Sequence, residues 1–503
     1  MTRNREIELK LDFGAGGAEA LKRHPMLGGD PSKAADQVST YFDTADRALR
    51  ASGFSLRVRG ARGRFVQTVK QSDGASAGLF DRPEWETEVK GPELDFDAAA
   101  ETPLGQILDK KLRKRLKPLI KVDVHRSTWE LEHEGSRIEL ILDEGKVTGG
   151  KNSQDIAEVE LELLSGEAGH LIDAARALAE EVPMRLGVLT KSERGYRLAD
   201  GKSGKVVKSE AIELRPDMKA ADGFAAIASA CLRHFRLNEA LVVEKRDPSA
   251  LHQTRVAMRR LRSAFTLFRP VIADEEYERL REEIRWFTNQ LGDARNIDVL
   301  LKRFSGDKKN EAAEMLRERL QEERETAYAA VLEALGSKRL RVMMIDLVAW
   351  IETGKWRSVN GMAAMPLPDF ASGRLDKRWR KVKKGGAALM QLDPEPRHQL
   401  RIEVKKLRYA VEFLASLTNS GEAAGKQASF VAALEEMQEQ LGELNDVETA
   451  RIMLANILGE DENSRGMMRY AARRLESPKS ENDQITAAQK AHAELLSVGR
   501  FWR

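Results

Sequence analysis

Acidic and basic side chains alternate with apolar ones in short stretches of the first 200 residues. Residues 6–11 read EIELKL, and successive side chains of a strand point to opposite faces, so Glu6, Glu8 and Lys10 share one face. The same texture recurs at 55–59, 64–70, 82–89, 137–142 and 158–163. The polar faces of these predicted strands carry mainly Glu, Arg and Lys, with few Ser, Thr or Asn.

One strand of this kind is typical of a sheet with one face in water. Many in succession favour a closed barrel whose charged faces point inward. Charges enclosed in this way are costly unless they pair with one another and a charged ligand fills the interior. Mg²⁺ is commonly shared between carboxylates and substrate phosphates, and Arg and Lys hold phosphate oxygens. The alternation therefore predicts a site for a metal ion and a phosphate group.

A second charged pattern occurs twice in the rest of the chain. Residues 252–265, HQTRVAMRRLRSAF, align without a gap with residues 398–411, HQLRIEVKKLRYAV. Helical spacing gathers the His and three of the following cations of each copy on one side of a helix. These two basic stripes are His252, Arg255, Arg259 and Arg262 in the first copy and His398, Arg401, Lys405 and Arg408 in the second.

The stripes differ from an ordinary solvated helix face, which usually mixes in carboxylates. Residues 252–262 contain no carboxylate, and residues 398–408 contain only Glu403. Unmixed cations repel one another unless an anion lies on them, and Arg and Lys together suit phosphate. We therefore expect phosphate contact at both stripes. Local capping or packing is the alternative role for the two histidines.

Length and composition limit the number of domains, the possible disulfides and the expected location of the protein. A chain of 503 residues suggests two or three domains, and its 83 Lys and Arg nearly cancel its 80 Asp and Glu. The single cysteine, Cys231, excludes an intramolecular disulfide. The sequence shows no secretory signal and no uncharged apolar stretch long enough for a membrane span, so we expect a cytoplasmic protein.

In the first part of the chain the strand motifs resemble those of the CYTH superfamily, the triphosphate tunnel metalloenzymes. The matching motifs are ExExK at 6–10, TYFDTADRAL at 40–49, LRVR at 56–59, QTVK at 67–70, RPEWE at 82–86, HR at 125–126, LDEG at 142–145 and EVELEL at 158–163. The resemblance implies an eight-stranded antiparallel β tunnel with outer helices over residues 1–205. It also implies hydrolysis of inorganic triphosphate to pyrophosphate and phosphate with Mg²⁺ or Mn²⁺.

Residue roles follow from the same resemblance. The expected metal ligands are Glu6, Glu8, Asp143, Glu158 and Glu160. The expected triphosphate cradle is Lys10, Arg57, Arg59, Lys70, Arg82, Arg126 and Lys191, with Lys191 closing one mouth of the tunnel. The expected catalytic residues are Glu84, Glu86 and Lys10; either Glu84 or Glu160 would orient the attacking water.

From about residue 216 the helical texture and the repeat resemble the conserved-histidine α-helical domain, CHAD. A second repeated signature supports this, LGDARNIDVL at 291–300 and LGELNDVETA at 441–450, although Asn296 stands where the family usually has an acid, as in Asp446. The resemblance implies an all-α domain at 216–500, with pseudo-symmetric halves at about 216–353 and 369–496. It implies polyphosphate binding along both stripes and association with polyphosphate granules.

Helical periodicity predicts helices at about 216–237, 248–268, 274–290, 295–305, 309–335, 338–353, 369–389, 395–417, 422–440, 445–457 and 464–496. The whole chain therefore reads as an α+β protein with a polar linker near 200–215.

Two alternatives to the triphosphatase stay open at this point. One is a non-catalytic polyphosphate-binding scaffold or granule component; nucleic-acid binding is disfavoured because the stripes lack interleaved aromatics. The other lies within the enzyme class, since adenylate cyclase and thiamine triphosphatase activities occur on the same fold.

Overall fold

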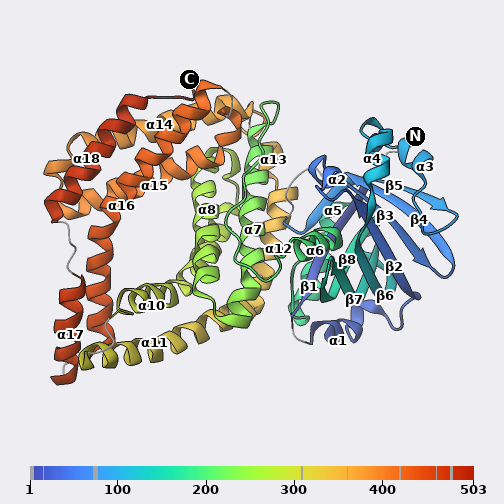
Figure 1. The fold of residues 1–503 in the computed structure, drawn as a ribbon, viewed down its shortest axis with the longest axis horizontal. Coiled ribbons are helices and arrows are strands. Elements are labelled where there is room, and N and C mark those ends of the chain that lie inside the picture. The colour runs from blue at the N-terminus through green and yellow to red at the C-terminus, as the bar shows by residue number, and fades with distance from the viewer. Residues whose placement is uncertain are drawn as a thin grey trace. The chain divides into compact units, whose positions relative to one another are not determined.

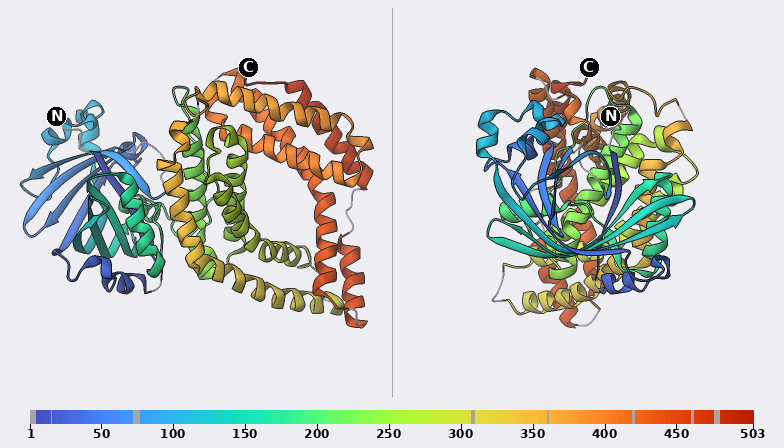
Figure 2. Two further views of the ribbon diagram at one scale, coloured as in Figure 1. Left: turned by 180° about the vertical axis from the view of Figure 1, so that it is seen from behind. Right: turned by 90° about the vertical axis from the view of Figure 1, so that its right-hand side faces the viewer.

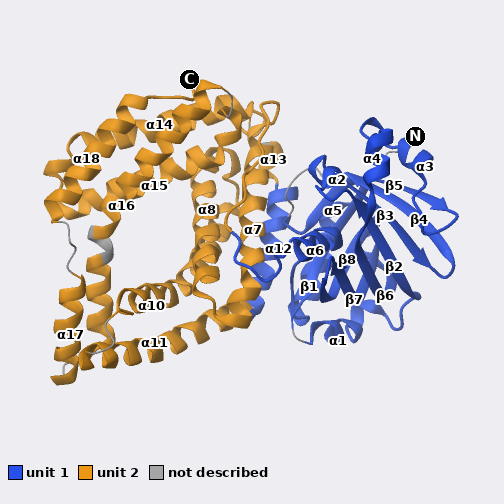
Figure 3. Cartoon of the chain, in the orientation of Figure 1, with its two compact units in different colours: residues 1–207, 336–354 blue, residues 208–335, 355–503 orange. Residues whose placement is uncertain are grey.

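The computed structural model describes residues 5–14, 16–71, 77–306, 310–359, 361–418, 421–459, 462–475 and 480–503. The chain divides into two compact units. Unit 1 comprises residues 1–207 and 336–354, and unit 2 comprises residues 208–335 and 355–503 (Figure 3). No helix within the described ranges is both long and apolar enough to cross a lipid bilayer.

Unit 1 is built around a closed antiparallel barrel (Figure 1). Its strands are β1 (Arg5–Phe13), β2 (Lys33–Asp43), β3 (Phe54–Ala61), β4 (Arg64–Gln71), β5 (Leu79–Val89), β6 (Lys117–His133), β7 (Ser136–Gly149) and β8 (Asn152–Ser165). They are hydrogen-bonded in the order β5-β4-β3-β2-β6-β7-β8-β1, and β1 closes the ring on β5. The predicted eight-stranded tunnel is confirmed. A short extra strand, β9 (Met184–Leu186), pairs with the end of β1 and was not predicted.

Helices pack around the barrel in two groups. The helices of unit 1 are α1 (Gly17–Lys22), α2 (Ala48–Ala51), α3 (Phe96–Ala100), α4 (Lys110–Arg115), α5 (Ala168–Glu181), α6 (Lys191–Ala199) and α12 (Lys338–Thr353). Outward-facing Leu56 and Val69 pack beneath α2, α3 and α4. Helix α5 lies on strands around β1 and β8 and carries α12 on its other side, where Arg176 Nε is 2.8 Å from Asp346 Oδ1.

Alternation in the strands decides which side chains enter the barrel. On β1, Leu9 and Leu11 point outward and are fully buried beneath the helices, while Glu6, Glu8 and Lys10 point inward. The same alternation holds around the ring, so the apolar face forms the outer core and the charged face lines the interior. The polar sides of the predicted strands are therefore the inside of the tunnel and not a solvated outer surface.

Unit 2 is all-helical. Its helices are α7 (Ala220–Lys245), α8 (Pro248–Ile272), α9 (Tyr277–Gln290), α10 (Gly292–Arg303), α11 (Glu311–Gly336), α13 (Trp356–Val359), α14 (Leu367–Ala387), α15 (Pro394–Phe413), α16 (Glu422–Ile457), α17 (Glu462–Leu475) and α18 (Glu481–Val498). Helix α7 runs beside α8, and α14 runs beside α15, so the duplicated sequence yields duplicated helix pairs (Figure 2).

The two halves of unit 2 meet where α8 contacts α14 and α15. The rings of Phe268 and Phe370 stack with centroids 4.7 Å apart, and Arg260 Nη1 of α8 is 2.6 Å from Glu412 Oε2 of α15. Two boundary predictions are wrong. The segments predicted as separate helices at 422–440 and 445–457 form the single helix α16, which LGELND allows because it contains no proline.

The same signature in the first half ends one helix and begins another. Helix α9 ends at Gln290 and α10 begins at Gly292, with Leu291 between them. The predicted helix at 464–496 is divided into α17 and α18, and residues 476–479 between them lie outside the described residues. The side chain of Asp446 is also outside the described part of the chain, so its comparison with Asn296 stays a prediction.

Candidate active site in the tunnel and a basic helical surface

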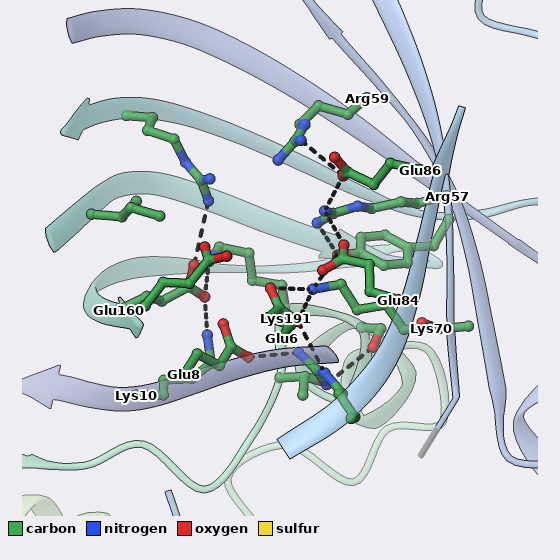
Figure 4. Close-up of a pocket in the computed structure, with 18 of the residues that line it drawn as sticks. Glu6, Glu8, Lys10, Arg57, Arg59, Lys70, Glu84, Glu86, Glu160 and Lys191 are labelled. Atoms are coloured by element: carbon green, nitrogen blue, oxygen red, sulfur yellow. Dashed lines mark hydrogen bonds and ion pairs between the residues drawn. The ribbon is translucent and has the colours of Figure 1, made fainter. Parts of the chain in front are cut away.

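The barrel encloses a cavity of about 260 Å³ whose lining is mainly ionic (Figure 4). All seven residues expected as a phosphate cradle line it. They are Lys10, Arg57, Arg59, Lys70, Arg82, Arg126 and Lys191. Seven carboxylates line it as well. They are Glu6, Glu8, Glu84, Glu86, Glu139, Glu160 and Glu162. The cavity wall is therefore balanced in formal charge.

The cations on one side of the cavity are paired with nearby carboxylates. Lys70 Nζ lies 2.5 Å from Glu6 Oε2 and 3.2 Å from Glu84 Oε1. Arg82 Nη2 lies 2.6 Å from Glu8 Oε1. These pairs hold the long side chains in place across strands β1, β4 and β5, as Figure 4 shows for Lys70, Glu6 and Glu84. An anion entering the cavity therefore meets cations whose directions are already set.

A second ionic cluster lies deeper, at the end of the cavity nearest α6. Lys191 Nζ contacts Asp143 Oδ2 at 2.7 Å, Glu158 Oε1 at 2.5 Å and Glu160 Oε1 at 2.9 Å. Lys10 Nζ contacts Glu158 at 3.1 Å and also Glu160. Burial opposes the charged form of Lys191, yet the three carboxylates raise its pKa well above the usual value. This cluster stays ionised although it is enclosed.

Arg126 is part of the cavity wall and also contacts the deep ionic cluster. Its guanidinium makes a paired contact with Asp143, with Nε–Oδ1 at 2.8 Å and Nη2–Oδ2 at 2.6 Å. Burial by itself raises the pKa of Asp143, but Lys191 and Arg126 lower it below its usual value. Asp143 and Glu158 are completely buried and do not line the cavity. Both lie behind its wall.

The structure contains two carboxylate sets that could hold a divalent cation. The first is Asp143, Glu158 and Glu160, whose ligand oxygens lie within 4.8 Å of one another. Four cations, Lys10, Lys191, Arg126 and Arg194, already contact these carboxylates, so a metal ion there has to displace ammonium or guanidinium groups. The second set faces the cavity. In the strand register Glu162 lies opposite Glu8 on one side and opposite Glu139 on the other.

The second set fits a hard cation better. Among the described residues, Glu139 and Glu162 take part in no ion pair or side-chain hydrogen bond, and like charges opposite one another destabilise a sheet. Burial, with repulsion from Glu6, Glu8 and Glu139, raises the pKa of Glu162 to about 7. A divalent cation bound by these oxygens would relieve that repulsion, and Mg²⁺ prefers oxygen ligands.

Sequence reasoning did not select Glu139 or Glu162 as site residues. The signal was present, because Glu162 continues the face that carries Glu158 and Glu160. Glu139 has the inward parity of RIELIL. Four uncharged polar side chains were also missed. These are Tyr41, Ser55, Thr190 and Ser192, all in the cavity lining. Burial opposes ionisation of Tyr41, but the nearby Arg57 and Lys191 lower its pKa.

The basic stripe of the first half lies on α8 and is extended by Arg295 of α10. Within the described residues no carboxylate pairs with Arg255, Arg259 or His252. Buried nitrogens of Arg255 (Nε and Nη1) and Arg259 (Nε) have no hydrogen-bond acceptor in the described structure. Burial and the neighbouring Arg259 and Arg295 lower the pKa of Arg255 to about 10. The stripe thus has donors and positive charge, and Asp293 opposes the lowering of the pKa of Arg255 without forming an ion pair with it among the described residues.

The repeated Leu-Gly signature explains how each stripe is positioned. A Cβ on Gly292 would lie 3.3 Å from Nη1 of Arg255, and a Cβ on Gly442 would lie 3.3 Å from Nη2 of Arg401. Each glycine therefore leaves room for the arginine that follows the stripe histidine by three positions. In the second stripe Arg408 Nη1 is held by Glu435 Oε1 at 3.0 Å and Glu412 Oε1 at 3.4 Å.

Comparison with known protein families matches both regions. The model of the CYTH domain matches residues 4–196, and the model of the CHAD domain matches residues 226–455. The chain is a CYTH–CHAD protein. The CYTH fold is associated with a divalent metal ion, which agrees with the carboxylates of the cavity. The CYTH domain corresponds to most of unit 1, and the CHAD domain lies within the helical region that follows it.

Individual relatives resemble one or both domains. The chain is 30% identical over 162 residues to an inorganic triphosphatase of Haemophilus influenzae, which covers 32% of this chain and 45% of that protein. It is 23% identical over 487 residues to an uncharacterised Mycobacterium tuberculosis protein, covering 87% and 86% of the two chains. The CHAD domain of the plant Ricinus communis superposes with a TM-score of 0.52 at 27% identity, covering 58% of this chain and 97% of that one. The alignment thus spans about half the length of the Haemophilus protein.

Proposed function

We propose that the CYTH domain hydrolyses inorganic triphosphate to pyrophosphate and phosphate with a divalent cation, and that the CHAD domain binds polyphosphate. The observation that carries the hydrolase proposal is the balanced lining of the cavity, with seven cations and seven carboxylates. A site that only bound anions would need the cations alone. Carboxylates in equal number repel a polyanion unless metal ions enter with it. The similarity to the Haemophilus inorganic triphosphatase supports the same substrate class.

The residues of the tunnel divide into three roles in this proposal. Glu8, Glu139 and Glu162 would hold the divalent cation, with Glu6 beside them. Such a cation, when bound, neutralises phosphate oxygens and lowers the pKa of a water molecule. The cradle arginines and lysines would bind the remaining phosphate oxygens and fix the chain along the cavity. Glu84, which is mostly buried and fixed by Lys70, would orient the attacking water; Glu86 lies nearer the solvent.

The proposed step is an in-line displacement. The water oxygen forms a bond to a terminal phosphorus, and the bridging P–O bond on the opposite side breaks. The electron pair of that bond leaves with pyrophosphate, and the proton of the water passes to a carboxylate and then to solvent. Charge neutralisation and positioning by preorganised groups would supply most of the rate. No covalent intermediate with the protein is required.

The polyphosphate proposal for the CHAD domain rests on the unpaired cations of the first stripe. Arg255 and Arg259 present donors that no described side chain accepts, on a helix face that contains no carboxylate. A chain of phosphates offers oxygens at short, regular intervals and has no other recognisable feature. A row of guanidinium groups therefore suits it.

The hydrolase proposal is tested by phosphate release from tripolyphosphate, ATP and thiamine triphosphate in Mg²⁺ or Mn²⁺. The wild type is compared with Glu6→Gln/Glu8→Gln and with Asp155→Asn, which changes an exposed carboxylate on the outer face of β8. We expect metal-dependent release from tripolyphosphate, lost in the double variant and kept in Asp155→Asn. Absence of turnover with every substrate, together with polyphosphate binding that survives the double variant, would support a non-catalytic scaffold.

A further inference from the structure

Helix α14 carries an exposed basic face that is part of neither the tunnel nor the stripes. Five cations lie on the side of the helix opposite its buried residues, within about two helical turns. They are Lys377, Arg380, Lys381, Lys383 and Lys384, and all five are exposed. We call this set the α14 face. The helix lies between α15 and α18 at one edge of unit 2 (Figure 1).

Few carboxylates balance the α14 face. Asp376 is the only acidic residue between positions 370 and 392, and it already pairs with the exposed side chains of Arg500 and Arg503. Among the described residues, Lys381 is the only one of the five cations in an ion pair, with Nζ 3.6 Å from Glu403. The surface therefore has an excess of positive charge, although the net charge of the chain is only +3. Such an excess repels itself unless an anion binds to it.

The α14 face is separate from the second basic stripe on the neighbouring helix. Glu403 of α15 contacts α14 through Arg378, whose Nη1 lies 3.1 Å from Glu403 Oε2. Glu403 follows Arg401 by two residues and precedes Arg408 by five. At the angular spacing of a helix, these offsets put Glu403 on the side of α15 opposite the stripe. The stripe and the α14 face therefore point in different directions.

The repeat shows that the duplicated fold does not account for these cations. The shift that aligns the two stripes also aligns the five cations with uncharged or weakly basic residues of α7. These are Cys231, His234, Phe235, Leu237 and Asn238. Cys231, Phe235 and Asn238 are at most 3% exposed. The same positions are thus buried in the first half but exposed and cationic in the second half.

Two exposed apolar side chains border the α14 face. Met390, in the 3₁₀-helix η3 (Leu389–Gln391) that follows α14, is 49% exposed, and Leu496 of α18 is 38% exposed. Leu496 lies one helical turn beyond His492, whose ring would be 2.3 Å from a Cβ on Gly386 of α14. Only six large apolar side chains in the described ranges are exposed, and these are two of them. The surface therefore combines ammonium groups with apolar tips.

This composition favours the headgroups of anionic lipids over a nucleic acid. Clusters of Lys and Arg on a helix attract acidic lipids, and apolar side chains beside them can enter the interface. Single-stranded nucleic acids are usually held by exposed aromatic rings, but Trp379 is 7% exposed and packs on Phe430. Four of the five cations are lysines, whereas arginine is preferred for paired contacts with bases and phosphates.

We propose that the α14 face docks the protein on membranes that contain anionic lipids. The apolar side of α14, including Leu375 and Val382, is buried in the helical core, so the helix stays folded in the domain and does not insert. Its ammonium groups contact the headgroup phosphates, and Met390 and Leu496 reach the boundary of the acyl chains. The contact is peripheral and reversible. It depends on neither the proposed hydrolysis in the tunnel nor the proposed binding of polyphosphate to the stripes.

The test measures binding of the full-length protein to vesicles by flotation. The vesicles consist of phosphatidylcholine alone or of phosphatidylcholine mixed with phosphatidylglycerol. The test variant is Lys377→Gln/Lys381→Gln/Lys384→Gln. Its matched control is Lys110→Gln/Lys111→Gln/Lys114→Gln, which removes the same charge from three exposed lysines of α4. A third variant, Met390→Asn/Leu496→Asn, removes the apolar tips and keeps every charge.

We expect the wild type to bind the anionic vesicles and not the neutral ones, and to bind more weakly as the salt concentration rises. The α14 variant should bind about 100-fold more weakly, as expected for the loss of three cations near an anionic membrane, and the α4 control should bind like the wild type. The apolar variant should bind about 3- to 10-fold more weakly. Arg255→Gln/Arg259→Gln should bind the vesicles like the wild type, because the first stripe is not part of the α14 face.

Three results would overturn the proposal. Equal losses in the α14 and α4 variants would show that net charge alone is responsible. Equal binding of the wild type to neutral vesicles would remove the need for anionic lipids. The third result is an α14 variant that still binds the vesicles but no longer binds long-chain polyphosphate or poly(A). That result would assign the face to a polyphosphate or a nucleic acid, and urea unfolding of each variant shows that the fold is kept.

Discussion

The tunnel and the first basic stripe are both rich in arginine and lysine, but they balance these charges in opposite ways. Lys70 lies between Glu6 and Glu84, at 2.5 and 3.2 Å. Arg255 lies instead beside Arg259 and Arg295, and its pKa falls to about 10 because of burial and these neighbours. The cations of the tunnel thus form ion pairs with carboxylates, whereas no carboxylate among the described residues forms an ion pair with Arg255 or Arg259.

This difference indicates what each region needs from its ligand. A polyanion that binds in the tunnel has to replace existing ion pairs. Its net gain in binding free energy is therefore small unless a metal ion binds the carboxylates that the cations leave. A polyanion on the stripe relieves repulsion and needs no metal ion. The two proposals together therefore predict a metal-dependent phosphate site in the CYTH domain and a metal-independent one in the CHAD domain. The following predictions are ordered from the largest expected effect to the smallest.

Removing a cation from the deep tunnel cluster should have the largest effect on stability. In Lys191→Met the carboxylates of Asp143, Glu158 and Glu160 lose a shared partner in a buried site. Breaking a buried ion pair on one side costs about 3–5 kcal/mol. Urea unfolding measures the change. Lys146→Met is the matched control, because Lys146 is exposed and weakly paired at 3.7 Å, and it should cost less than about 1 kcal/mol. Equal effects of the two variants would contradict a sealed cluster.

Removing cations from the first stripe should weaken polyphosphate binding without lowering stability. Arg255→Gln/Arg259→Gln should weaken polyphosphate binding about 10- to 30-fold, since each cation near an anionic surface contributes about 1 kcal/mol. It should leave the free energy of unfolding unchanged or slightly increased, because two repelling charges are gone. Calorimetric titration and urea unfolding provide the two readouts. Arg319→Gln, an exposed residue of α11, should bind like the wild type; destabilisation of the double variant would argue that the arginines serve folding.

The second stripe can be made more like the first. In Glu435→Gln, Arg408 loses the nearer of its two carboxylates, at 3.0 Å, and keeps Glu412 at 3.4 Å, so its guanidinium becomes more available to phosphate. We expect polyphosphate affinity to rise about 2- to 5-fold, as expected for one additional cation. Glu494→Gln removes an exposed charge from α18, away from this contact, and tests for a general charge effect. An equal rise in both variants would show that net charge, and not the Arg408 pair, is responsible.

The smallest effect should be a pH dependence of the free energy of unfolding that arises from His252. Burial and the neighbouring Arg295 and Arg259 lower its pKa from 6.5 to about 4. Because the folded state holds this histidine neutral, its contribution to stability is complete above pH 6.5 and is lost as the pH falls toward 4. Unfolding of the wild type and His252→Gln between pH 7 and pH 4.5 measures the difference. Parallel pH profiles would contradict the shift; polyphosphate should reduce it by favouring the protonated ring.

Much of this contrast could be predicted from the sequence, because it depends on the alternation of charged and apolar residues in the strands and on the composition of the stripe. Period-two spacing placed Glu6, Glu8 and Lys10 on one face, and the absence of carboxylates in 252–262 indicated an unpaired stripe. The depth of each side chain along the barrel axis could not be predicted. Glu158, Glu160 and Glu162 share one strand face, yet only their distance from α6 decides which is sealed and which faces the cavity.

The division of the helical region between the two units also could not be predicted from local sequence patterns. The spacing of apolar residues predicted a helix at 338–353, and α12 has these bounds. Its place in unit 1, through Arg176 and Asp346, depends on a tertiary contact between segments far apart in the chain. The packing of Tyr196 and Leu198 of α6 inside the barrel has the same origin. No helix was predicted at residues 191–199, and only the closed barrel gives their apolar side chains an interior to fill.

The most direct test of the charge comparison is a titration of the full-length protein with an imido-bridged triphosphate that resists hydrolysis, in EDTA and in Mg²⁺. The account predicts that the part of the heat lost in Lys70→Met appears only in Mg²⁺, whereas the part lost in Arg255→Gln/Arg259→Gln is present in both solutions. Tunnel binding of equal strength in EDTA would contradict the claim that the carboxylates of the cavity must be taken over by a metal ion before phosphate can bind.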